Sequence, residues 1–118
     1  MEKLVVDWIL ATEAQVEGKH LNEKQSNSIV ELLELCTHNP SIAFSVICQL
    51  LATNPREKVI GCLGAGPLED LLIQHCHFIE KTIEEAAKNK LLKKCLEYVN
   101  VDQEDCPNAQ KLYDFLKN

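Results

Sequence analysis

Glycine and proline are scarce in this sequence, with four of each among 118 residues, and only six side chains are aromatic. So few glycines exclude a collagen-like chain, and a hydrophobic content of 46% argues against disorder. Basic residues are also outnumbered, because 12 lysines and arginines accompany 18 acidic residues and leave a net charge of −6. Since such a chain repels phosphate backbones and anionic headgroups, we expect neither a nucleic-acid nor a membrane partner.

Long apolar runs are missing as well. No uninterrupted stretch approaches the ~18 residues of a membrane span. The apolar segment at residues 4–11 is broken by Asp7 and lacks the basic flank and cleavage site of a signal peptide. We therefore expect a cytoplasmic protein, and the length fits one domain over residues 1–118.

Cysteines in the Cys-x-x-Cys arrangement do not occur, although six cysteines are present. They are spread evenly, and most lie within apolar stripes, where cysteine packs as a small hydrophobic residue. Together with the missing signal peptide, this distribution predicts free and mostly buried thiols rather than disulfides. The residues concerned are Cys36, Cys48, Cys62, Cys76, Cys95 and Cys106.

Apolar residues recur at helical spacing along nearly the whole chain, and no alternating β pattern of useful length occurs. Within residues 25–38, for example, Ile29, Leu32 and Cys36 follow the i, i+3, i+7 template. The spacing predicts helices over residues 2–16, 25–38, 55–63, 67–88 and 91–99, with one more between the pairs Asn39-Pro40 and Asn54-Pro55 and a last one opened by Pro107.

The two Asn-Pro pairs are typical of helix starts. Asparagine accepts the free N–H groups of a first turn, and proline suits a position whose N–H would be unpaired. Between the pairs, nearly every position outside a narrow polar stripe is apolar. A helix that is apolar on almost all sides belongs in the middle of a bundle.

The segment from Gly61 to Pro67 is rich in glycine but differs from a phosphate-binding loop. No strand precedes it, the glycine order is reversed and no lysine follows. We interpret Gly64-Ala65-Gly66 as a left-handed cap that ends one helix, with Pro67 opening the next. That next helix can run to Lys88, with residues 75–78 as the place where it becomes irregular.

These patterns predict an all-α fold, a compact irregular bundle of six or seven short helices. Helix pairs in this order are also found in solenoids. A repeat of 40–47 residues would fit fewer than three times, however, and three repeats are the least that a stable stack needs. A compact bundle is therefore the favoured architecture.

Catalytic and metal-binding constellations are hard to assemble from this sequence. His75-Cys76-His77 is the densest group of metal ligands, but neighbouring helical residues point in different directions and do not close on one ion. A nucleophilic cysteine paired with a histidine from a distant segment remains an alternative. No family motif indicates which of the six cysteines would be the nucleophile. We expect no enzyme, no metal and no cofactor.

Acidic residues gather in two clusters. Glu80, Glu84 and Glu85 form the first on a predicted helix, where like charges at i, i+4 cost a few tenths of a kcal/mol. Asp102, Glu104 and Asp105 form the second, on a connection that is long enough to adapt. Without a functional role, the first cluster is a solvated helix face and the second is an acidic segment before the last helix. With a functional role, both clusters form a surface that binds a basic partner.

The run Ala65-Gly66-Pro67-Leu68-Glu69-Asp70-Leu71-Leu72 resembles the core motif of an uncharacterised bacterial all-α family. The resemblance covers about half of the chain, over residues 52–96. Cys76 stands where that family has glycine, and residues 90–94 lack its proline and arginines. The resemblance implies a bacterial origin and a small helical domain, and it supplies no catalytic residue.

Size and charge together favour an inhibitor that captures a basic protein. The hypothesis is a cytosolic immunity protein that neutralises a bacterial toxin, such as a contact-dependent growth inhibition nuclease, through the two acidic clusters. A helical adaptor without a toxin partner is the first alternative. A small hydrolase with a dispersed site is the second, and it is weaker because no local nucleophile, metal or cofactor motif stands out.

Overall fold

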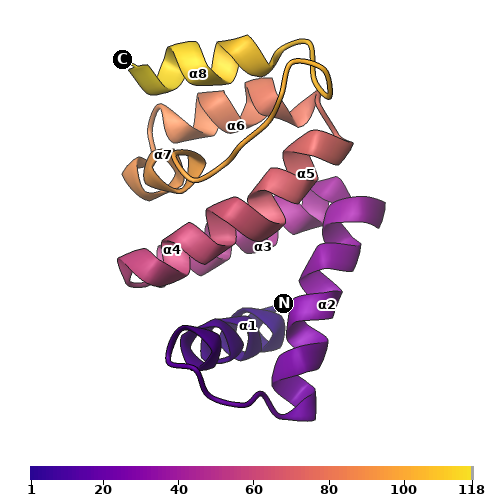
Figure 1. Ribbon diagram of the computed structural model, residues 1–118, viewed down its shortest axis with the longest axis vertical. Helices are drawn as coiled ribbons and strands as arrows, with labels where there is room; N and C mark the ends of the chain where they lie inside the picture. Colours follow the sequence, from indigo (N-terminus) through magenta and orange to yellow (C-terminus); the bar gives the residue numbers. More distant parts are fainter. Residues whose placement is uncertain (118) are drawn as a thin grey trace.

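The computed structural model describes residues 1–117 and is helical, with no strand in that range. The segments α4, η1 and α5 follow one another without a break, so that the described residues form seven helices (Figure 1). The prediction of an all-α fold is therefore confirmed. The elements are α1 (Glu2–Val16), α2 (Glu23–His38), α3 (Pro40–Ala52), α4 (Glu57–Leu63), the π-helical η1 (Gly64–Leu68), α5 (Glu69–Gln74), α6 (Phe78–Ala86), α7 (Lys90–Leu96) and α8 (Ala109–Lys117).

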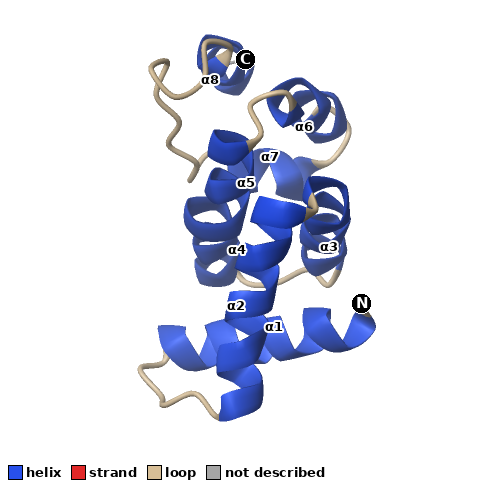
Figure 2. Ribbon diagram, turned by 90° about the vertical axis from the view of Figure 1, so that its right-hand side faces the viewer, coloured by secondary structure: helices blue, strands red, loops and turns tan. Residues whose placement is uncertain are grey.

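The helices form three tiers along a molecule of 39 × 27 × 23 Å. At one end α1 runs across the lower half of α2, the rod of α4 to α5 lies beside α3 in the middle, and α6, α7 and α8 form the other end (Figures 1 and 2). One hydrophobic core includes residues from all seven helices. None of the described helices is long and apolar enough to cross a membrane.

Two asparagine caps were predicted, and the structure confirms one. The Asn39 side chain accepts the Ile42 N–H, and Pro40 occupies the first turn of α3, whose apolar residues are mostly buried. Asn54 instead has a φ of 56° just beyond the end of α3, and α4 begins only at Glu57. The prediction of a helix start at Asn54-Pro55 was wrong, because asparagine also tolerates the left-handed conformation that ends helices.

The Gly-Ala-Gly-Pro segment does not cap a helix. Gly64 has φ −69° and ψ −49°, Gly66 has no positive φ, and Pro67 lies inside η1. In an α-helix the Pro67 ring would clash with the carbonyl group four residues earlier. The wider π turn relieves that clash, with the Glu69 N–H donating to the Gly64 carbonyl five residues back. The prediction of a left-handed cap at this segment is therefore wrong.

The long helix predicted over residues 67–88 is two helices. α5 ends at Gln74, His75 adopts φ −134° and ψ 72°, and α6 begins at Phe78. The expected irregularity at residues 75–78 is thus a complete break. The last helix also begins later than predicted, at Ala109 rather than at Pro107.

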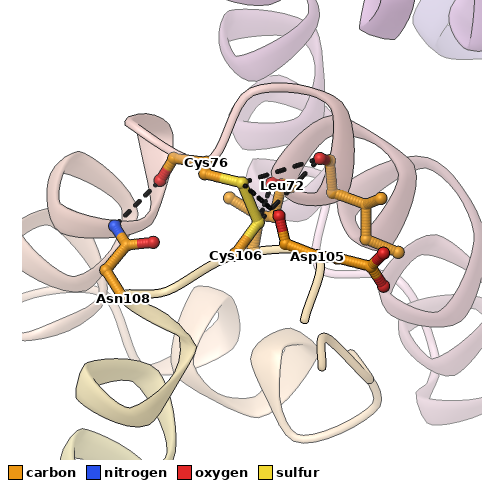
Figure 3. The surroundings of a disulfide bond; sticks show 6 residues. Leu72, Cys76, Asp105, Cys106 and Asn108 are labelled. Carbon is orange, nitrogen blue, oxygen red and sulfur yellow. Dashed lines mark hydrogen bonds between the residues drawn. A yellow bond between two sulfur atoms is a disulfide. The ribbon is translucent and has the colours of Figure 1, made fainter. Parts of the chain in front are cut away.

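A disulfide between Cys76 and Cys106 corrects the prediction of six free thiols. Their Cα atoms are 5.5 Å apart, although 30 residues separate them in sequence. The bond joins the turn between α5 and α6 to the segment before α8 (Figure 3). No local pattern indicates this bond, because neither cysteine has a partner nearby in the sequence and Cys76 lies in a turn rather than on a helix.

Candidate functional site

The first acidic cluster lies on α6 and is partly neutralised. Glu80 forms an ion pair with Lys111 of α8, and this lysine holds the pKa of the Glu80 carboxyl below its usual value. Glu85 pairs with Lys88 at 3.7 Å between carboxylate oxygen and Nζ. Glu84 is exposed, and no ion pair within residues 1–117 involves it. Two of the three carboxylates in this cluster therefore have a lysine partner, which offsets the repulsion between like charges on α6.

The second acidic cluster occupies the connection between α7 and α8. The side chains of Asp102, Glu104 and Asp105 are all exposed, and the structure pairs none of them with a cation in the range that it describes. The backbone forms a tight turn, since the Asp102 carbonyl accepts the N–H groups of Asp105 and Cys106 at 3.1 and 2.9 Å. Carboxylates in this loop therefore face solvent from an ordered backbone.

Three contacts fix the loop that carries the second cluster. The Tyr113 hydroxyl accepts the Val101 N–H at 2.8 Å and lies 3.1 Å from the Val101 carbonyl oxygen. The Asn108 amide donates to the Cys76 carbonyl at 3.0 Å, beside the disulfide (Figure 3). The connection was expected to be adaptable, but hydrogen bonds hold it near both of its ends.

The two clusters lie in the same end of the molecule, where α6 and α8 pack side by side (Figure 1). No hydrogen bond or ion pair among the described residues joins one cluster to the other. The charge around them is nearly balanced, because residues 78–118 contain eight acidic and seven basic side chains. Residues 1–77 contain ten acidic and five basic ones and carry most of the net charge.

The glycine-rich motif is a packing centre. Gly64 lies against α7, where an added Cβ would be 2.3 Å from the Cys95 carbonyl oxygen. The buried Cys36 thiol donates to the Pro67 carbonyl at 3.3 Å. The Glu69 carboxylate accepts the Asn100 N–H at 2.8 Å, which ties the motif to the connection after α7. These contacts give most of the motif a structural role. The sequence pattern had indicated only the end of a helix there.

The histidines near the break between α5 and α6 are dispersed. The half-buried His75 ring places Nε2 3.1 Å from the Thr37 carbonyl oxygen, while the exposed His77 ring packs edge-on against Phe78. No group of three metal-ligating side chains occurs in the described part of the chain. Cys76, the third member of the predicted trio, is bonded to Cys106.

The four free thiols differ sharply in their environments. Burial raises the pKa of both Cys36 and Cys95 to about 12, and it also raises the pKa of the half-buried Cys48. Cys62 is exposed on α4.

Alkylation of the native protein at pH 8 should therefore modify Cys62 first. A thiol with a pKa of 12 is about one part in ten thousand thiolate at that pH, and only the thiolate reacts. Mass spectrometry of peptides after brief treatment with iodoacetamide measures the order, and the same treatment in denaturant is the control. Early labelling of Cys36 or Cys95 in the native protein would contradict the buried placement.

Two depressions lie at the end formed by α1 and α2, away from the acidic clusters. A groove of about 540 Å³ contains both lysines and carboxylates, among them Lys3, Asp7, Lys24 and Glu31. A smaller cleft of about 170 Å³ is lined by three helical segments. Sequence reasoning found neither, because their residues are distant in the chain and share no motif. The smaller cleft is lined by Trp8, Thr12, Gln15, Ile29, Leu33, Cys62, Gly66 and Pro67.

Comparison with known protein families identifies a match over most of the chain. Residues 15–108 match the model of a family of unknown function, DUF6869. The chain belongs to this family. The part shared with DUF6869 includes both acidic clusters and the disulfide, whereas Trp8 and Thr12 precede it. No curated protein and no solved structure matched the chain. Membership of DUF6869, an uncharacterised family, agrees with the kind of family that the sequence resembles.

Proposed function

We propose that this protein is a non-enzymatic inhibitor that binds a basic protein, as a cytoplasmic immunity protein binds a bacterial toxin. The observation that carries the proposal is the ordered acidic loop over residues 102–105. It presents three carboxylates to solvent on a backbone that is held by the hydrogen bonds of Tyr113 and Asn108. A partner would not have to order this loop, and the cost of association falls accordingly.

The cluster on α6 supports the loop in a different way. Glu84 offers a free carboxylate, whereas the ion pairs of Glu80 and Glu85 are exposed and so contribute little to stability. A basic partner can exchange these lysines for its own arginines and lysines. Binding through both clusters would be fast, because complementary charge raises association rates more than it raises affinity.

A helical adaptor that is not connected with a toxin is the second candidate. The same acidic surfaces serve both functions, so the identity of the partner distinguishes them. The product of the neighbouring gene is the partner to test first, and a secreted protein that ends in a small basic domain would favour immunity. Inhibition of the activity of that domain would then separate an inhibitor from an adaptor.

Charge reversal provides the sharpest test of the binding surface. We expect Glu104→Lys together with Asp105→Lys to slow association with the basic partner by about tenfold at low salt and to flatten its salt dependence. Stopped-flow measurement of the association rate at several salt concentrations gives both quantities. The loop should keep its fold, because the hydrogen bonds that fix it involve its backbone and other side chains.

The matched control is Glu31→Lys with Glu34→Lys on α2, which changes the net charge by the same amount at two exposed positions outside the acidic clusters. If both double variants slow association equally, only the overall charge matters and the acidic loop is not the binding surface. An association rate indifferent to salt and to both double variants would exclude electrostatic capture.

A further inference from the structure

The smaller cleft lies where α1, α2 and the junction of α4 with η1 meet. Trp8, Ile29, Leu33 and Pro67 make its lining mainly apolar. Gly66 faces open space, because a Cβ added there would find no heavy atom within 4 Å. A small residue thus keeps the cleft open at one edge, and the volume of about 170 Å³ is close to the ~150 Å³ in which an apolar cavity holds one benzene molecule.

Thr12 supplies an unusual polar group to this lining. The residue is 1% exposed, and its Oγ1 atom has no hydrogen-bond partner among the described residues. A buried hydroxyl without a partner is costly, and native structures rarely retain one. Threonine in a helix divides between two rotamers, and a rotation of about 120° about its Cα–Cβ bond moves the hydroxyl to another staggered position. The hydroxyl can therefore turn to meet a group bound in the cleft.

We propose that this cleft is a binding site for a small molecule that has one apolar ring and one hydroxyl group. The ring would pack against Trp8 and Pro67 in the space that Gly66 leaves open. The hydroxyl of the ligand would bond to the Thr12 hydroxyl, which can donate and accept. This site is independent of the proposed capture of a basic protein, since the acidic clusters lie at the other end of the molecule.

Phenol and toluene are suitable probes because they differ only by a hydroxyl in place of a methyl group. Titration of the intact protein, followed by ¹H–¹⁵N spectra, should show saturable shifts of the Trp8 indole N–H and the backbone amides of Thr12 and Gly66. Phenol should bind about fivefold more tightly than toluene, because one added hydrogen bond is worth that factor. Thr12→Val should remove this preference, and Thr12→Ser, which keeps the hydroxyl, should retain it.

A second variant tests the shape of the site. Gly66→Leu should fill the cleft and abolish binding of both probes, while the far-UV spectrum and thermal midpoint stay close to those of the natural protein. Gly66→Ala is a smaller change and should weaken the binding of phenol and toluene by a lesser factor. This variant replaces Gly66→Leu in the test if the leucine variant folds poorly. Absence of saturable shifts up to about 10 mM phenol, shifts spread over unrelated helices, or an unchanged preference in Thr12→Val would each overturn the proposal.

Discussion

Gly64→Ala should lower the free energy of unfolding by about 3 kcal/mol, because overpacking of this kind typically costs 1–3 kcal/mol and the obstruction here is backbone. The new Cβ would lie 2.3 Å from the Cys95 carbonyl oxygen and 2.9 Å from the Tyr98 Cβ. Neither atom is the end of a flexible side chain, so α7 would have to move away from η1. Urea unfolding followed by circular dichroism measures the change.

Gly66→Ala is the matched control, since it places the same methyl group in the same π segment, where nothing lies within 4 Å. Alanine is favoured over glycine in a helix by roughly 0.5–1 kcal/mol, so this variant should be as stable as the natural protein or slightly more stable. Equal unfolding free energies for the two variants would show that the helices do not approach as closely at Gly64 as the structure indicates.

Loss of the Cys76–Cys106 disulfide should lower the free energy of unfolding by about 3 kcal/mol, the value for a closed loop of a few tens of residues. For a domain of this size, that corresponds to a fall of roughly 10 °C in the thermal midpoint. Without the bond, the acidic loop keeps only its contacts with Tyr113 and Asn108. Scanning calorimetry with and without reducing agent measures the difference.

The double variant Cys76→Ala with Cys106→Ala separates the bond from other effects of the reagent. Its midpoint should already be lowered and should not respond to reducing agent. Cys62→Ala, which removes an exposed free thiol, should leave both the midpoint and its response unchanged. A thermal midpoint of the natural protein that does not respond to reducing agent would contradict a stabilising Cys76–Cys106 bond.

Local rules predicted the fold class and much of the helix placement. The helix over residues 2–16 is confirmed to the residue, and Asn39-Pro40 begins α3 as expected. The start of α2 was placed two residues late, although the sequence contains the signal for it. Asn22 and Gln25 form a capping box, each side chain accepting the backbone N–H of the other.

The remaining features depend on contacts between distant residues. Gly-Ala-Gly-Pro has the sequence of a helix end, and the helix continues because Gly64 fits against α7 and Cys36 satisfies the Pro67 carbonyl. Both acidic clusters were visible in the sequence, but the partner of Glu80 lies 31 residues away. The cleft beside Thr12 depends on three segments that only the tertiary structure brings together.

The π turn also determines how the side chains of α5 are rotated about the helix axis relative to those of α4. A wider turn holds one residue more than an α-helical turn, and each residue of an α-helix advances the side chains by about 100° around the axis. If Gly64–Leu68 formed a regular α-helix instead, every side chain after η1 would be rotated by that amount relative to α4. Leu71 and Leu72 would turn out of the core, and the Glu69 carboxylate would turn away from the Asn100 amide. The orientation of the whole segment from α5 to α8 relative to α1 and α2 is thus determined by a single inserted residue.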